Sequence, residues 1–145
     1  MSSPPVFALV SGGWHQSSCY ELLLAELHKR KYETRTTTLR SVGNAAGTME
    51  SDIEGIRQDL LLPVLDRQRD VVLVLHSLSG LAGGSATLNM SAGDRKAKGL
   101  KGGIIGIICL CAIVTPEGGS AHGHGITATK HDVSLAPWGV RGIVC

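Results

Sequence analysis

The stretch that decides the fold runs from Asp70 to Gly80 and reads DVVLVLHSLSG. It begins with branched apolar residues from Val71 to Leu75, which is typical of a strand buried on both faces of a sheet. The chain then turns abruptly at Ser77, and small residues at helical spacing follow in a helix predicted to end between Gly93 and Gly99. A strand, a sharp turn with serine at its apex and a close-packed helix are the elements of a nucleophile elbow.

Further apolar runs predict strands beside this one. Val6 to Val10 reads as a short buried strand that stops at the paired glycines of Ser11 to His15, and Gly103 to Val114 reads as a longer strand buried on both faces. Thr34 to Leu39 is β-branched but more polar, so this strand is expected nearer an edge of the sheet. Helical patterns separate the strands, which predicts an α/β fold with a parallel sheet covered by helices on both faces.

The predicted helices carry their own start and stop signals. Ser18 to Glu21 and Ser51 to Glu54 both have the form of a capping box, and the first helix is expected to run to about Arg30. Pro63 lies inside the second helical pattern and should kink or break that helix near Leu62. The apolar face of the first helix is predicted to consist of Cys19, Leu22, Leu23 and Leu27.

Length and composition fit one globular domain. The chain has 145 residues, is 43% hydrophobic and carries a formal net charge of +2, too small to indicate nucleic acid or an anionic membrane as partner. The basic segment Arg95 to Lys98 is expected to be a solvated helix end. The start of the chain lacks the features of a secretory signal and the longest apolar run is too short to span a bilayer, so we expect a cytoplasmic protein.

The four cysteines and the last third of the chain are less informative. No two cysteines form a CxxC pair, and Cys109 and Cys111 are expected on one face of the last strand, so packing thiols are favoured over a metal or redox site. Residues 1–118 are predicted to form a partial α/β core. Residues 119–145, with their glycines, their histidines and Trp138, are predicted to form a loosely ordered tail.

Ser77 is the candidate nucleophile. A serine hydroxyl attacks a carbonyl only when a base takes its proton and hydrogen-bond donors stabilise the oxyanion. An elbow at Ser77 would point the backbone N–H of Leu78 at the reacting oxygen, and the N–H of Gly13 can supply the second donor from the neighbouring loop. The elbow motif G-x-S-x-G reads Leu75-His76-Ser77-Leu78-Ser79 here, so a purely structural serine is the alternative.

Four stretches of the sequence, taken together, carry a resemblance to a known family: Ala8 to His15, Leu39 to Gly43, Val71 to Gly80, and Gly102 to Gly118. They resemble the α/β-hydrolase fold family, and within it the single-domain esterases related to plant hydroxynitrile lyases and methyl-ester esterases. That family often carries Val or Leu where Leu75 stands, whereas Ser11 departs from the usual His or Pro. The resemblance implies the strand order second, first, third, fourth. It also implies Ser77 as nucleophile, the N–H groups of Gly13 and Leu78 as oxyanion hole, and no cofactor or metal.

The acid and base of a hydrolase triad are not evident in the sequence. Family members place them on loops after later strands, so this chain resembles a hydrolase truncated after its fourth strand. His76 is expected to pack away from the pocket, and His15 to lie near the oxyanion loop. The residues that could replace the missing acid and base are Glu117 with His122, His124 or His131.

The sequence therefore leaves several functions open. We expect a serine-type hydrolase of small carboxylic esters that works through a Ser77 acyl-enzyme. The alternative is an inactive truncated hydrolase or pseudoenzyme that acts as a binding or partner protein, with self-association through an exposed sheet edge. A lyase on the same scaffold is a further reading. A dinucleotide-binding domain is disfavoured because the loop from Ser11 to His15 lacks the G-x-G-x-x-G spacing.

Overall fold

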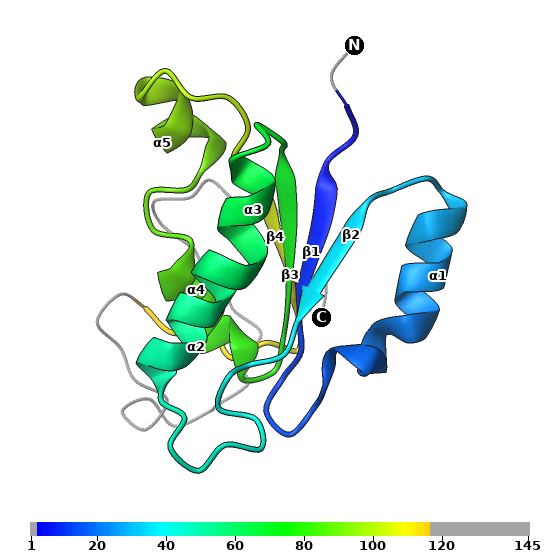
Figure 1. Cartoon of the computed structure of the whole chain (residues 1–145), viewed down its shortest axis with the longest axis vertical. Coiled ribbons are helices and arrows are strands. Elements are labelled where there is room, and N and C mark those ends of the chain that lie inside the picture. Colours follow the sequence, from blue (N-terminus) through cyan, green and yellow to red (C-terminus); the bar gives the residue numbers. More distant parts are fainter. Residues whose placement is uncertain (1–2, 117–145) are drawn as a thin grey trace.

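The computed structural model describes residues 3–116, which form a parallel four-stranded sheet with helices on both faces (Figure 1). The strand order is β2-β1-β3-β4, which confirms the predicted α/β class and the order second, first, third, fourth. The strands are β1 (Val6–Val10), β2 (Thr34–Thr37), β3 (Val71–His76) and β4 (Ile104–Leu110). The polar strand β2 lies at one edge of the sheet, as its composition predicts.

The register of the sheet brings two loops together. Strand β1 pairs in parallel with β3 from Val6↔Val71 to Val10↔Leu75, so both strands end at the same level. The carboxyl ends of parallel strands lie at one edge of a sheet, where ligands of α/β proteins bind. The glycine loop after β1 and the turn after β3 are therefore neighbours.

Helices cover the two faces unequally. Helix α1 (Glu21–Lys29), preceded by a 3-10 turn (Ser17–Tyr20), lies on one face. The other face carries α2 (Met49–Gly55), a π-helical turn (Ile56–Leu61), α3 (Leu62–Leu65), α4 (Ser79–Ala86) and α5 (Ala92–Ala97) (Figure 1). The main core lies between this second group and the sheet. It includes one apolar face of the chain from α2 to α3, formed by Ile56, Leu60, Leu61 and Val64, with Ile53 partly buried.

Both predicted capping boxes are wrong. Ser18 belongs to the 3-10 turn, where no side chain caps the helix, and α1 begins only at Glu21. The second helix begins earlier than predicted, because Thr48 is its N-cap and exchanges hydrogen bonds with Ser51. Ser51 therefore completes a capping box and does not start one. The motif identified the right helix and missed its start by one turn.

The predicted irregularity at Pro63 is confirmed, and its form is a π-helical turn. Proline has no N–H to donate, and its ring crowds the carbonyl four residues earlier, here that of Asp59. The chain widens into i→i+5 hydrogen bonding from Ile56 to Leu61 and then resumes an α-helix in which Pro63 occupies the first turn. The apolar face is buried despite this change of helical geometry.

The helix after Ser77 is not continuous, which corrects the prediction of one helix that ends between Gly93 and Gly99. Helix α4 ends at Ala86, and Ser91 then pairs with Ile104 before it caps α5 through the N–H of Asp94. Met90 also accepts the N–H of Ile104 through its carbonyl at 2.9 Å. The segment between the two helices therefore supplies hydrogen-bond partners to the backbone at the start of β4. This long-range pairing outweighs the local helical propensity of the segment.

Two predicted apolar surfaces are more exposed than expected. Strand β4 is shorter than Gly103 to Val114 and is not buried on both faces, because Ile105 is 52% and Ile108 37% exposed at the outermost strand of the described sheet. No residue of α1 is buried, and Leu22 is 86% exposed. Leu24, which was not predicted, packs α1 against the small cluster of Leu9, Tyr20 and Val74.

Cys111 lies beyond β4 with a positive φ of 46°, so it does not share a strand face with the buried Cys109. Within residues 3–116, no helix has the length and apolarity that a membrane span requires. The predicted tail with Trp138 lies outside the described residues, as do Glu117, His122, His124 and His131.

Candidate functional site

Ser77 occupies a strained turn at the carboxyl end of β3. Its φ is +53°, in the left-handed region that serine rarely adopts and that costs about 1 kcal/mol or more. The surrounding backbone holds it there: the Ser77 N–H donates to the Leu110 carbonyl at 3.3 Å, and the Ser77 carbonyl accepts the N–H of Ile113 at 2.9 Å and of Gly80 at 3.2 Å. This is the geometry that a nucleophile elbow requires.

The two unusual ends of the elbow motif have structural explanations. Leu75 stands where the motif has glycine, and its side chain fills the space beside Gly83 of α4, where an added Cβ would clash with it. Ser79 stands at the other glycine position and is fully buried. Its hydroxyl accepts the His76 N–H at 2.8 Å and faces the carbonyls of His76 at 2.9 Å and Val10 at 3.1 Å. No local sequence pattern predicts this bonding, because Val10 lies 69 positions away from Ser79.

The glycine loop after β1 lies directly against the elbow. A Cβ added to Gly12 would lie 2.9 Å from the Ser77 Cβ and 3.0 Å from the His76 Nδ1, so no side chain fits there without a shift. A Cβ added to Gly13 would lie 3.1 Å from the Leu78 Cδ2. The glycines therefore permit the loop to contact the turn.

Hydrogen bonds within the loop fix its shape. The Ser11 hydroxyl donates to the His15 carbonyl at 2.9 Å, and the His15 N–H donates to the Gly12 carbonyl at 3.2 Å. The His15 Nδ1 lies 2.8 Å from the Gly13 carbonyl oxygen. Within residues 3–116, the backbone N–H groups of Gly13 and Leu78 have no hydrogen-bond partner. Their role as oxyanion hole stays a prediction.

Two histidines lie beside the elbow. The rings of His15 and His76 meet edge to face, with centroids 5.5 Å apart. The His76 Nδ1 is buried without a hydrogen-bond partner among the described residues, in agreement with a packed ring. In the same part of the chain no carboxylate contacts a histidine ring, so residues 3–116 do not assemble the acid and base of a triad. The predicted candidates for those roles lie outside the described residues.

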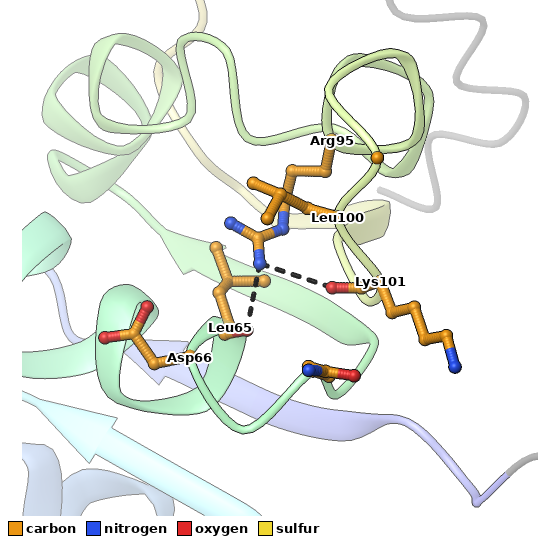
Figure 2. Close-up of a pocket in the computed structure, with 7 residues that line it drawn as sticks. Leu65, Asp66, Arg95, Leu100 and Lys101 are labelled. Atoms are coloured by element: carbon orange, nitrogen blue, oxygen red, sulfur yellow. Dashed lines mark hydrogen bonds between the residues drawn. The ribbon is translucent and has the colours of Figure 1, made fainter.

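A second feature of the surface lies away from Ser77. A cavity of about 350 Å³ is lined by Leu65, Asp66, Gln68, Arg95, Gly99, Leu100 and Lys101 (Figure 2). Gln68 precedes β3 and Lys101 precedes β4, so the cavity lies at the amino ends of these strands, opposite the elbow. Arg95, predicted to be solvated, donates through Nη2 to the Leu65 carbonyl at 2.9 Å and through Nε to the Gly102 carbonyl at 2.8 Å. Its role is structural.

Similarity to a known protein agrees with the α/β fold. The chain is 30% identical over 131 residues to the α/β hydrolase nvfD of Aspergillus novofumigatus (strain IBT 16806), which covers 89% of this chain. The chain is a relative of the α/β hydrolases. It spans about half of that relative, 51% of its length, and no family model matches it. The resemblance to α/β hydrolases is thereby confirmed, and the parallel sheet agrees with it. The finer likeness to the esterase and hydroxynitrile lyase group stays a prediction.

Proposed function

We propose that this hydrolase relative carries a serine nucleophile for the cleavage of small carboxylic esters. The observation that carries the proposal is the φ of +53° at Ser77, between β3 and α4. A strained left-handed serine persists only where its surroundings impose it, and such strain is concentrated at functional sites. The contact of Gly12 with Ser77 adds a donor loop beside it.

The proposed reaction is acyl transfer. The Ser77 Oγ attacks the ester carbonyl carbon, and the N–H groups of Gly13 and Leu78 stabilise the negative oxygen, each contributing about 3 kcal/mol to the transition state. The tetrahedral intermediate collapses to an acyl-enzyme and expels the alcohol, and water then releases the acid. The serine proton passes to a base and from there to the leaving alcohol. Glu117 with His122, His124 or His131 are the candidates in this sequence for the acid and base. The cytoplasm is the proposed location.

A fluorophosphonate probe tests the nucleophile directly. We expect the full chain to be labelled and the Ser77→Ala variant not to be labelled. We expect the labelling rate of Gly12→Ala to fall by about tenfold or more, because the added Cβ would push the donor loop off the elbow. Ser85→Ala is the matched control, since Ser85 is an exposed serine of α4. A folded chain that shows no Ser77-dependent labelling would overturn the proposal and favour the inactive alternative.

A further inference from the structure

The carbonyl of Val10, the last residue of β1, accepts two side-chain hydroxyl groups. The Tyr20 hydroxyl donates to it at 2.8 Å, and the Ser79 hydroxyl lies 3.1 Å from it. Both residues are buried. Burial raises the pKa of the Tyr20 phenol above its ordinary value of 10.0, so this hydroxyl keeps its proton and remains a donor.

Ser79 also binds the strand on the other side. It accepts the His76 N–H at 2.8 Å, and its single hydroxyl proton faces the carbonyls of Val10 and His76, the latter at 2.9 Å. Val10 ends β1 and His76 ends β3. One buried hydroxyl therefore ties together the ends of the two strands that carry the glycine loop and the elbow.

The position of this link gives it a consequence for the site. Gly12 and Gly13 begin two residues after Val10, and Ser77 follows His76 directly. The available space around Gly12 is small, since an added Cβ would lie 2.9 Å from the Ser77 Cβ. A small displacement of the Val10 carbonyl is transmitted to Gly13, whose N–H must point at the same oxygen as the N–H of Leu78.

We propose that Tyr20 and Ser79 are positioning residues that clamp the Val10 carbonyl and so hold the glycine loop against the Ser77 elbow. The catalytic meaning of the clamp rests on the proposed function, whereas the clamp itself does not. Neither residue touches the reacting atoms. They act through the backbone of Val10, from α4 on one side and from the 3-10 turn before α1 on the other.

Amide hydrogen exchange tests the clamp without any need for activity. The reporter is the His15 N–H, which donates to Gly12 within the loop and touches neither substituted residue. We expect Ser79→Ala and Tyr20→Phe each to accelerate its exchange about tenfold, with the amides of β3 from Val71 to Leu75 unchanged. We expect the double variant to show less than the product of the two effects, because both hydroxyls hold the same carbonyl.

Matched controls separate the clamp from a general loss of stability. Ser85→Ala removes an exposed serine from α4, and Tyr32→Phe removes a tyrosine hydroxyl that donates no hydrogen bond among the described residues. Neither control should change His15 exchange. The clamp is overturned if Ser79→Ala accelerates only the His76 amide, or if exchange rises equally throughout the sheet.

Probe labelling supplies the second arm of the experiment. Both clamp variants should lower the rate constant of fluorophosphonate bond formation at Ser77 about fivefold or more, with the initial binding constant unchanged. Absence of labelling in the wild type would reject the proposed function, and hydrogen exchange would still decide on the clamp. Unchanged labelling in variants whose loop exchanges faster would reject a positioning role in the reaction.

Discussion

At the residue scale, the site depends on how a few backbone groups are held. Ser77 keeps its positive φ because Leu110, Ile113 and Gly80 bind its N–H and carbonyl from three directions. The glycine loop keeps its shape through contacts within Ser11 to His15. The geometry of the candidate site is therefore built mainly from main-chain contacts, which many side-chain substitutions leave intact.

Glu33 gives a prediction on pH at this scale. Its carboxylate accepts hydrogen bonds from Arg67 at 2.8 Å and Arg69 at 3.1 Å, and Arg35 lies 3.8 Å away. The hydrogen bond from Arg67 is the main cause that lowers the pKa of Glu33 below its ordinary value of 4.5. A carboxyl with a lowered pKa in the folded state stabilises the protein above its unfolded pKa, and this stability is lost as the pH falls through the folded pKa.

We therefore expect Glu33→Gln to lower the free energy of unfolding at pH 7 by about 0.5–1 kcal/mol. The effect is small because solvent screens the ion pairs of a surface carboxylate. The difference between variant and wild type should shrink steadily below pH 4.5. Urea unfolding at pH 7 and at pH 3 measures both values. A difference of the same size at the two pH values would show that charge is not its cause.

The residues of the candidate site divide by how local their signals are. The sharp turn at Ser77 and the glycine loop beside it were predictable, because a serine or paired glycines directly after a buried strand is a local pattern. Ser79 and Tyr20 were not, because their partner is the carbonyl of Val10, which for Ser79 lies 69 positions away. The prediction that Arg95 is solvated is wrong for the same reason, since its acceptor at Leu65 is distant in sequence.

At the element scale, α4 shows how the elbow is accommodated. Gly83 and Gly84 are adjacent in sequence and face different surroundings. A Cβ at Gly83 would clash with Leu75, whereas a Cβ at Gly84 would meet nothing within 4 Å. The close approach of α4 to β3 therefore depends on one of the two glycines.

Alanine substitutions at the pair should have opposite signs. We expect Gly84→Ala to stabilise the protein by about 0.5–1 kcal/mol, because alanine favours a helix over glycine. Gly83→Ala should destabilise it by about 1–3 kcal/mol through overpacking. Thermal and urea unfolding measure both, and Gly83→Ala should cost less in a Leu75→Ala background. Equal effects at both positions would contradict this account of the packing.

Strands were predicted better than helix ends. The short branched apolar runs of β1 and β3 favour a strand over a helix, and the polar β2 was correctly predicted at an edge of the sheet. The break between α4 and α5 was not predictable, because it follows from the pairing of Ser91 with Ile104. Likewise, both Thr48 and Ser51 are residue types that act as helix N-caps. Which of them begins α2 depends on the path of the preceding loop, and the N-cap is Thr48.

At the scale of the whole molecule, the described sheet exposes apolar side chains at β4. Ile105 and Ile108 are exposed, and no charged residue or proline lies between Ile104 and Leu110. Edge strands of soluble proteins usually carry charged residues or proline, which prevent pairing with another chain. The surface therefore bears directly on the expectation of self-association.

We expect the apparent mass of the chain in sedimentation velocity to rise with concentration. Ile108→Lys and Ile105→Lys should lower it towards the monomer without a lower melting temperature, because both side chains already contact water. Leu88→Lys serves as control, since Leu88 is 60% exposed away from β4. A mass that is monomeric at every concentration, or that Leu88→Lys lowers equally, would reject association through β4.

The strand order also governs how the chain can fold during synthesis. Strand β1 is synthesised before the other three described strands, yet it lies between β2 and β3, and its pairing with β3 requires every residue up to His76. The nascent chain must keep the apolar stretch from Val6 to Val10 unpaired on one side while some sixty further residues emerge, at about 5–20 residues per second. Such long-range parallel pairing folds slowly. The interval of several seconds before β3 arrives is the period in which a chaperone would have its main effect on the yield of this protein.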